Sequence, residues 1–169
     1  MIAAWAILAA VVVQRLVEVA YASRNAAALV RAGGVEVGRG HYPAMVVLHT
    51  AWLAAIAVGI ARRPELHPAA LVAYAALQPL RVWTIATLGR FWTTRVITVK
   101  DVPLVRRGPY RYLRHPNYVV VVGEVVLLPL GFGQVVTAAV FSAANLALLA
   151  WRVRIEQTAL APRVSMPGR

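Results

Sequence analysis

The stretch Gly108-Pro109-Tyr110-Arg111-Tyr112-Leu113-Arg114-His115-Pro116-Asn117-Tyr118 leads directly into the apolar block Val119-Val120-Val121-Val122. Proline is well placed at the first position of a helix, where its missing N–H has no helical partner. The stretch therefore predicts a helix that begins at Pro116, with His115 near its N-cap and Asn117 in its first turn. Polar side chains at the mouth of an apolar helix are costly to bury. They indicate either a functional site or an interfacial helix start whose arginines bind headgroup phosphates.

The composition is that of an integral membrane protein. Of the 169 residues, 60% are hydrophobic and only 14% are charged, and the mean hydropathy is +0.66. A soluble domain of this size could not bury so much apolar surface. The net charge of +12 would suggest nucleic acid in a soluble protein. Here the arginines form short blocks between apolar runs, so we expect anionic membrane lipids as partners and no nucleic acid.

Five apolar segments predict the fold: residues 2–21, 42–61, 68–88, 118–130 and 134–151. The first three approach the ~20 residues that span a membrane. The fourth is short and joins the fifth through Gly131-Phe132-Gly133, which predicts a helical hairpin packed against protein. No positive region precedes the first apolar segment, so we expect a retained helix there and not a cleaved signal. The predicted fold class is an all-α integral membrane protein of about five transmembrane helices, in one domain of residues 1–169.

The distribution of Lys and Arg predicts the orientation. Most of them lie in residues 22–41, in residues 89–117 and in the tail after residue 151, whereas Arg62 and Arg63 lie in the loop on the other side. Cytoplasmic loops are enriched in Lys and Arg. We therefore expect the N-terminus outside, and the long loops and the C-terminus in the cytoplasm.

Several ionisable residues fall inside the apolar segments at a similar depth, namely Arg15, Glu18, His49, Arg81 and Glu124. Ionisable groups in lipid usually face one another or a cavity. Two interpretations stay open: mutual pairing of the arginines with the glutamates, or a polar chamber that opens to the cytoplasm.

The chemistry of the opening stretch suits a zwitterionic ligand that carries an adenine. A helix N-terminus offers unpaired N–H groups and a positive dipole end to a carboxylate or phosphate. Tyr110 and Tyr118 offer aromatic faces to a base or a sulfonium. Arg152 and Glu156, four residues apart on one helical face, add charges of both signs.

Other site classes find little support in the residues. The chain has no Cys, and its four His have no close spacing, so we expect no metal site. Ser is scarce and no nucleophile elbow is present. No P-loop or dinucleotide-binding glycine pattern occurs.

An ordered set of motifs resembles the isoprenylcysteine carboxyl methyltransferase family. The set comprises Leu104-Val105, Gly108-Pro109-Tyr110-Arg111 and Arg114-His115-Pro116-Asn117-Tyr118, then the apolar hairpin and Arg152-Val153-Arg154-Ile155-Glu156-Gln157-Thr158-Ala159-Leu160. The run Leu88-Gly89-Arg90-Phe91-Trp92-Thr93-Thr94-Arg95 is similar to bacterial members. The resemblance covers residues 88–160, nearly half of the chain.

The resemblance implies a membrane O-methyltransferase that uses S-adenosyl-L-methionine without a Rossmann domain. Its cytoplasmic cofactor pocket would lie in a catalytic core of residues 89–160, which follows the N-terminal helices of residues 1–88. Carried over by position, the cofactor-binding residues are Val102, Pro103, Leu104, Val105, Tyr110, His115, Pro116, Asn117, Tyr118 and Glu156, with Arg95 as an addition.

The resemblance also implies residues near the methyl acceptor. Arg152 matches the arginine placed there, and Arg154 is a rival because the alignment can slip by two residues. Glu124 lies about two turns beyond Asn117 and is either a general base for a neutral hydroxyl or a structural partner of Arg81.

Two departures from the family pattern concern the tail. Glu156-Gln157 stands where the family often has two acids, and the segment after residue 161 is short. The cofactor lid is therefore expected to be shorter, or to be completed by lipid or a second subunit.

The family name suggests a prenylated cysteine carboxylate as acceptor, but such prenylated proteins are not expected in bacteria. Some bacterial members methylate hydroxyls of alkylpyrones and alkylresorcinols. We therefore expect a lipophilic small-molecule acceptor that enters from the bilayer, in a bacterial inner-membrane protein. The alternative is a non-enzymatic membrane binding or assembly protein that retains the fold. The sequence does not indicate an oligomeric state.

Overall fold

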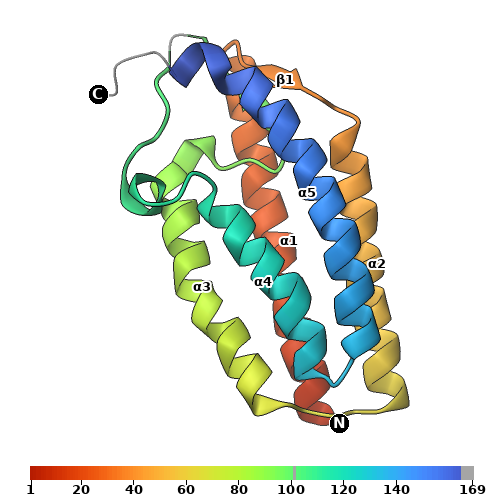
Figure 1. The fold of residues 1–169 in the computed structure, drawn as a ribbon. Helices are drawn as coiled ribbons and strands as arrows, with labels where there is room; N and C mark the ends of the chain where they lie inside the picture. Colours follow the sequence, from red (N-terminus) through yellow and green to blue (C-terminus); the bar gives the residue numbers. More distant parts are fainter. Residues whose placement is uncertain (101, 165–169) are drawn as a thin grey trace.

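The computed structural model describes residues 1–100 and 102–164, without the side chains of residues 160 and 162–164. Its α-helices lie side by side in a bundle (Figure 1). They are α1 (Ile2–Arg31), α2 (His41–Arg62), α3 (Pro68–Leu88), α4 (Pro116–Gly131) and α5 (Val135–Val164). The short elements are β1 (Val35–Val37), β2 (Val96–Thr98) and the 3-10 turns η1 (Gly89–Phe91) and η2 (Gly108–Arg111).

The helices confirm an integral membrane protein. Four of the described helices, α1, α2, α3 with η1, and α5, are long and apolar enough to cross a membrane. With 16 residues α4 extends about 24 Å, which is less than a ~30 Å hydrocarbon core. Large apolar side chains such as Val13, Leu16 and Val17 are exposed on the outside of the bundle. Such a surface suits lipid and not water.

The predicted hairpin of α4 and α5 is present, and α4 packs between α3 and α5. Gly133 makes the turn with a φ of +70°, a conformation that glycine adopts at little cost. Gly123 allows α4 to approach α3 closely, since a Cβ added there would lie 2.6 Å from Cδ1 of Leu77. The hairpin is therefore held against protein, as its length and turn predicted.

The apolar core lies in the half of the bundle that contains the N-terminus and the α4–α5 turn (Figure 1). Its buried members come from α1, α2, α3, α4 and the turn after α4: Ala4, Leu8, Val11, Trp52, Ile56, Ile60, Tyr74, Val125, Leu128 and Phe132. The apolar packing is concentrated at this end of the bundle, and the polar elements lie at the opposite end.

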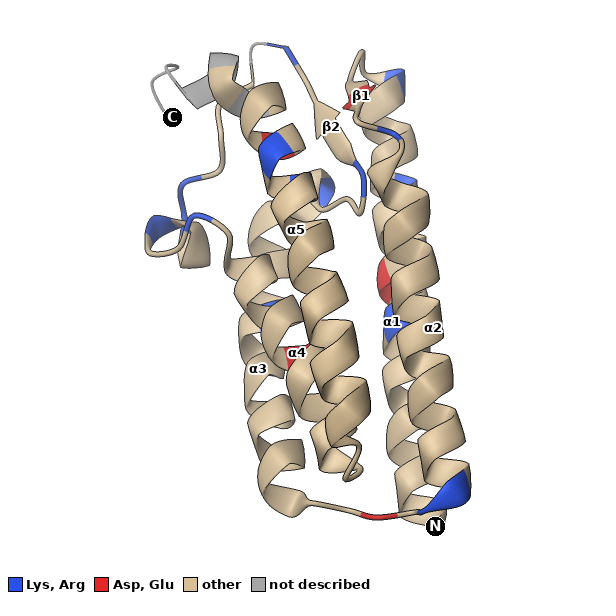
Figure 2. Cartoon of the chain, turned by 45° about the vertical axis from the view of Figure 1, so that its right-hand side comes forward, with Lys and Arg blue, Asp and Glu red and all other residues tan. Residues whose placement is uncertain are grey.

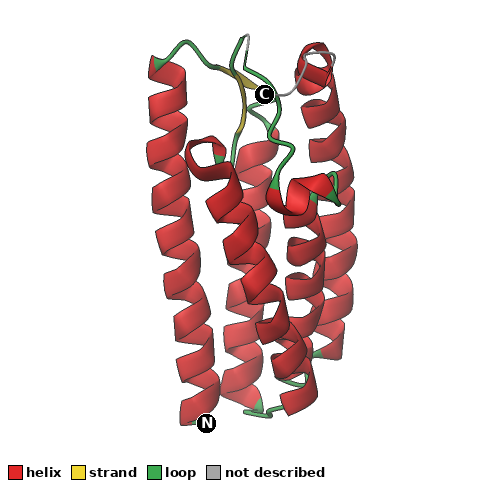
Figure 3. Ribbon diagram, turned by 90° about the vertical axis from the view of Figure 1, so that its left-hand side faces the viewer, coloured by secondary structure: helices red, strands yellow, loops and turns green. Residues whose placement is uncertain are grey.

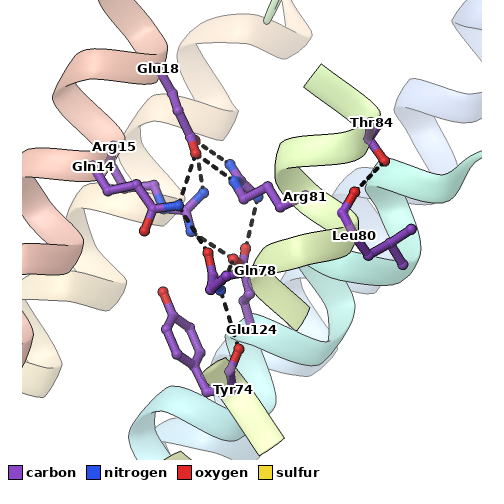
Figure 4. A network of polar contacts seen from close by, with 9 residues as sticks. All are labelled: Gln14, Arg15, Glu18, Tyr74, Gln78, Leu80, Arg81, Thr84 and Glu124. Carbon is purple, nitrogen blue, oxygen red and sulfur yellow. Dashed lines mark hydrogen bonds and ion pairs between the residues drawn. The ribbon is translucent and has the colours of Figure 1, made fainter. Parts of the chain in front are cut away.

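Between the core and the opposite end lies a network of buried and half-buried ions, which we call the quartet: Arg15, Glu18, Arg81 and Glu124 (Figure 4). Arg15 pairs with Glu18 at 3.0 Å and with Glu124 at 2.7 Å. Arg81 pairs with the same carboxylates at 2.5 Å and 2.9 Å. The two positive and two negative charges cancel, which is how ions are tolerated in a membrane interior. Mutual pairing, one of the two interpretations of these residues, is confirmed.

The end of the bundle that carries β1 and β2 is also the basic end. Figure 2 shows most of the Lys and Arg at this end, above the long tan shafts of the helices. Figure 3 shows the strands and most of the loop between α3 and α4 at the same end. The loop between α2 and α3, with Arg63, lies at the other end.

Two features were not predicted correctly, the length of α1 and the β1–β2 ladder. The helix of residues 2–21 continues to Arg31, because residues 22–31 include Ala26, Ala27 and Ala28, which favour helix. The last helix continues through the tail to Val164, in agreement with the single helical face predicted for Arg152 and Glu156. Residues assigned to loops also form an antiparallel ladder that pairs Val35 with Thr98 and Val37 with Val96. Strands of three residues are too short to show an alternating pattern in the sequence.

Candidate active site

A cavity of about 930 Å³ opens at the basic end. Its walls come from the loop that precedes α4, from the start of α4, from β2 and η1 with the residues between them, and from the last turns of α1, α3 and α5. Segments distant in sequence therefore build it together. Its size lies within the ~300–1,000 Å³ typical of small-molecule sites.

The start of α4 and the tail of α5 are joined at Tyr118. Pro116 occupies the first helical turn and His115 is the N-cap, as predicted. The rings of His115 and Tyr118 stack with centroids 5.0 Å apart. The Tyr118 hydroxyl donates a hydrogen bond to the Glu156 carboxylate and accepts one from Nε of Arg152 at 2.9 Å. The spacing of four residues places Arg152 and Glu156 on one helical face, where both reach Tyr118.

Arg152 is buried and held from several sides. Its Nη1 donates to the Thr94 carbonyl at 2.6 Å and contacts Sδ of Met45 at 3.0 Å. These contacts, together with the bond to Tyr118, fix the guanidinium at the inner wall of the cavity. A guanidinium held in one geometry is prepared to bind an anionic oxygen without further ordering.

The charge of the cavity is strongly positive. Among the described lining residues Glu156 is the one carboxylate, against the guanidiniums of Arg95, Arg106, Arg111, Arg114 and Arg152. Burial raises the pKa of Tyr110 above its ordinary value, and the nearby Glu156 carboxylate raises it further. The Tyr110 phenol is therefore neutral, and its ring forms an uncharged patch between charged groups.

Three buried polar atoms of the described cavity lining have no hydrogen-bond partner, one of them Nε1 of Trp92. The other two, Nε2 of His115 and Oδ1 of Asn117, lie at the start of α4. Buried polar atoms in proteins are nearly always paired. These atoms at the start of α4 are therefore available to a bound molecule. No group of His, Cys, Asp and Glu in the described part of the chain could hold a metal ion.

Most of the residues that the sequence singled out are brought together here. Those that line the cavity are Arg95, Leu104, Val105, Tyr110, His115, Asn117, Tyr118, Arg152 and Glu156. Val102 and Pro103 precede the lining residues in the same loop, and Pro116 is fully buried beneath it. Pro116 therefore shapes the helix start and does not itself form the wall.

Two candidates lie elsewhere. The carboxylate of Glu124 belongs to the quartet and also accepts a bond from Gln78 at 2.9 Å. It is the structural partner of Arg81, the second of its two predicted roles. Arg154 is exposed and lines no described cavity, whereas Arg152 does. Of the two arginines, Arg152 therefore has the position that the cavity requires, and its role beside the acceptor stays a prediction.

Several lining residues were missed: Leu29, Leu88, Phe91, Trp92, Val96 and Ile97. The sequence could have indicated some of them, because the run of residues 88–95 is similar to bacterial members of a known family. Only Arg95 of that run was predicted to bind the cofactor. Nothing in the sequence indicated that Leu29 and Ile97 line the site. They reach it through the extension of α1 and the β1–β2 ladder, which were not predicted. The short lid expected from the tail falls on residues 162–169, whose side chains lie outside the described residues.

Comparison with known proteins agrees with the motifs. The model of the isoprenylcysteine carboxyl methyltransferase family matches residues 68–162, which include α3, α4, most of α5 and the loop that lines the cavity. The chain is 35% identical over 162 residues to a Bacillus subtilis (strain 168) protein described as uncharacterized protein YpbQ, and the match covers 92% of this chain and 95% of that protein. No solved structure matches the chain. Since the family model covers more than half of the sequence and includes the residues around the cavity, the chain belongs to the isoprenylcysteine carboxyl methyltransferase family.

Proposed function

We propose that the protein is an S-adenosyl-L-methionine-dependent O-methyltransferase of a lipophilic acceptor. Family membership supports a membrane methyltransferase. The observation that carries the finer proposal is the cavity itself. The family motif around His115 and the tail pair Arg152 and Glu156 meet in its wall and are joined through Tyr118.

The residues of the cavity fit the proposed cofactor, which supplies an activated methyl group on a sulfonium. Arginines such as Arg111 and Arg114, with the N–H groups at the start of α4, suit its carboxylate. Glu156 suits its ammonium group or ribose hydroxyls. The aromatic faces of Tyr110 and Phe91 suit the adenine or the sulfonium. The unpartnered Nε2 of His115 offers a further hydrogen bond.

The acceptor is proposed to be an alkylpyrone- or alkylresorcinol-type hydroxyl, or a lipidic carboxylate. Apolar lining residues such as Leu29, Leu88 and Ile97 suit a hydrocarbon tail. The acceptor oxygen would form a C–O bond to the methyl carbon as the C–S bond breaks, so that S-adenosylhomocysteine would leave as a neutral thioether. A hydroxyl acceptor would lose its proton to water. Such a displacement depends mainly on position, and an acidic enol or carboxylate needs little help from a base. Arg152 would hold the acceptor oxygen as it carries negative charge.

We also propose a bacterial inner-membrane location with the N-terminus outside and the cavity facing the cytoplasm. The support is the concentration of Lys and Arg at the end that holds the cavity (Figure 2). Reporter fusions at the loop between α2 and α3 and at the C-terminus test this. Labelling of the α2–α3 loop from the cytoplasm would contradict it.

The central experiment is transfer of a labelled methyl group from S-adenosyl-L-methionine by protein purified in detergent. An alkylpyrone, an alkylresorcinol and a prenylcysteine are compared as acceptors, and binding of S-adenosylhomocysteine is measured by calorimetry. We expect binding of S-adenosylhomocysteine and transfer to at least one acceptor. Binding without transfer would favour a binding protein that retains the fold. Absence of binding would overturn the proposal.

A further inference from the structure

A second, smaller chamber of about 50 Å³ adjoins the cavity. The two spaces share five lining residues: Trp92, Thr93, Asn117, Tyr118 and Arg152. The remaining wall of the chamber includes Met45 of α2 and Asn145 of α5. The chamber is therefore an inner recess next to the guanidinium of Arg152, deeper in the bundle than the cavity.

Three buried polar atoms of the chamber lining have no hydrogen-bond partner: Nε1 of Trp92, Oδ1 of Asn117 and Nδ2 of Asn145. Asn145 is 2% exposed and lies within the membrane-spanning part of α5, where an unpaired amide is especially costly. Ser142, one turn earlier on α5, also has an unpartnered oxygen but lines neither space. Asn145 thus differs from Ser142 because it faces a space that a ligand could enter.

The unpartnered atoms are complementary to a hydroxyl group. Trp92 and Asn145 present N–H donors, whereas Asn117 presents a carbonyl acceptor. A hydroxyl oxygen accepts hydrogen bonds and donates one, so it can pair with both kinds of group. An ionised carboxylate only accepts and has no proton for Asn117. A methylated oxygen likewise has no proton to donate.

We propose that this chamber binds a second hydroxyl of the acceptor, one that does not receive the methyl group, and that Asn145 selects for it. An oxygen whose lone pairs are engaged by Trp92 and Asn145 has none free to attack a methyl carbon. The reacting oxygen therefore lies in the larger cavity, and the acceptor carries two oxygen functions on one ring. This inference rests on the proposed function, whose acceptor class it narrows to ring systems such as resorcinols.

The test compares two probes with the same alkyl chain, a 5-alkylresorcinol and a 3-alkylphenol that lacks the second hydroxyl. We expect the wild-type protein to bind the resorcinol about tenfold more tightly and to methylate it with about tenfold higher kcat/KM. Asn145→Leu keeps the volume and removes the amide, so it should reduce both preferences to below about twofold. Trp92→Phe, which removes a single donor, should reduce them by a smaller factor.

Ser142→Ala is the matched control, because it removes an unpartnered oxygen from the same helix outside the chamber. It should keep the full preference. Asn145→Leu should bind S-adenosylhomocysteine with unchanged affinity and should melt no lower than the wild type. These two measurements separate a specificity effect from misfolding.

The outcomes distinguish this inference from the proposed function. The inference is wrong if the wild type binds and methylates both probes equally, or if the preference persists in both Asn145→Leu and Trp92→Phe. The chamber would then hold only water, and the proposed methyltransferase activity would remain valid. The wild type could instead bind the resorcinol preferentially, lose that preference in Asn145→Leu, and transfer no methyl group to either probe. That result would support the proposed hydroxyl site in the chamber and contradict the proposed methyltransferase activity.

Discussion

The quartet and the cavity are both polar regions in an apolar bundle, yet they differ in how completely their groups are paired. In the quartet every carboxylate meets both guanidiniums, and the charges cancel. The cavity has an excess of arginines over Glu156, and the buried atoms Nε2 of His115 and Oδ1 of Asn117 have no partner. Saturated pairing indicates a structural role, because nothing is left for a ligand. Incomplete pairing indicates a site that a ligand completes.

Removal of one quartet member should give the largest effect on stability. Glu124→Ala leaves Arg15 and Arg81 without one of their carboxylates in a buried place. We expect a loss of about 3–5 kcal/mol in the free energy of unfolding. Denaturant titration in detergent measures it. Glu65→Ala, which removes an exposed partner of His67, should cost less than about 1 kcal/mol. A stable Glu124→Ala protein that has lost only methyl transfer would contradict the structural role of the quartet.

Substitution of the two tail arginines, Arg152 and Arg154, tests whether the cavity is a functional site. Arg152→Ala should lower kcat/KM by about 10–100-fold, since hydrogen bonds to charged groups contribute about 1.5–3 kcal/mol. Arg154→Ala removes an exposed guanidinium and should change kcat/KM by less than about twofold. Steady-state kinetics with a labelled methyl donor compare the pair. Equal losses in the two variants would mean that the assignment of Arg152 to the acceptor is wrong.

Glu156 should affect ligand binding more than folding, the reverse of Glu124. Glu156→Gln keeps the shape and an acceptor for Tyr118 but removes the negative charge. We expect about tenfold weaker binding of S-adenosylhomocysteine by calorimetry, the lower end of the range for charged hydrogen bonds. The free energy of unfolding should change by less than about 1 kcal/mol. A large loss of stability with unchanged binding would place Glu156 with the structural residues.

The smallest effect is expected at Tyr110, which offers its ring and not its charge. Since burial raises its pKa, the phenol stays protonated beyond the ordinary range. Tyr110→Phe should therefore change S-adenosylhomocysteine affinity by less than about twofold, whereas Tyr110→Ala should weaken it more. The affinity of the wild type and of Tyr110→Phe should have the same pH dependence between pH 8 and 10. A step near pH 10 that Tyr110→Phe removes would show an ionising phenol.

Local patterns predicted a large part of the fold. The bounds of α3 were predicted to the residue, and Pro116 marked the start of α4. The short fourth segment with its glycine turn predicted the hairpin. Hydrophobic length and proline position are local properties, so they can be read without tertiary structure. The extension of α1 also had a local signal, the run Ala26 to Ala28, which was overlooked. The β1–β2 ladder depends on contacts between distant segments and could not be read in this way.

The sequence by itself determined the membrane character, the basic end and the family motif from His115 to Glu156, because composition, charge blocks and residue spacing are local. Only the tertiary structure decided which of two arginines lines the cavity and that Glu124 is a partner of the quartet. It alone decided that Asn145 faces a recess beside Trp92. The physical reason is that the pairing of polar groups in a low-dielectric interior depends on which helix faces meet. The sequence supplies those groups, and the packing of α1, α3, α4 and α5 determines which of them remain unpaired.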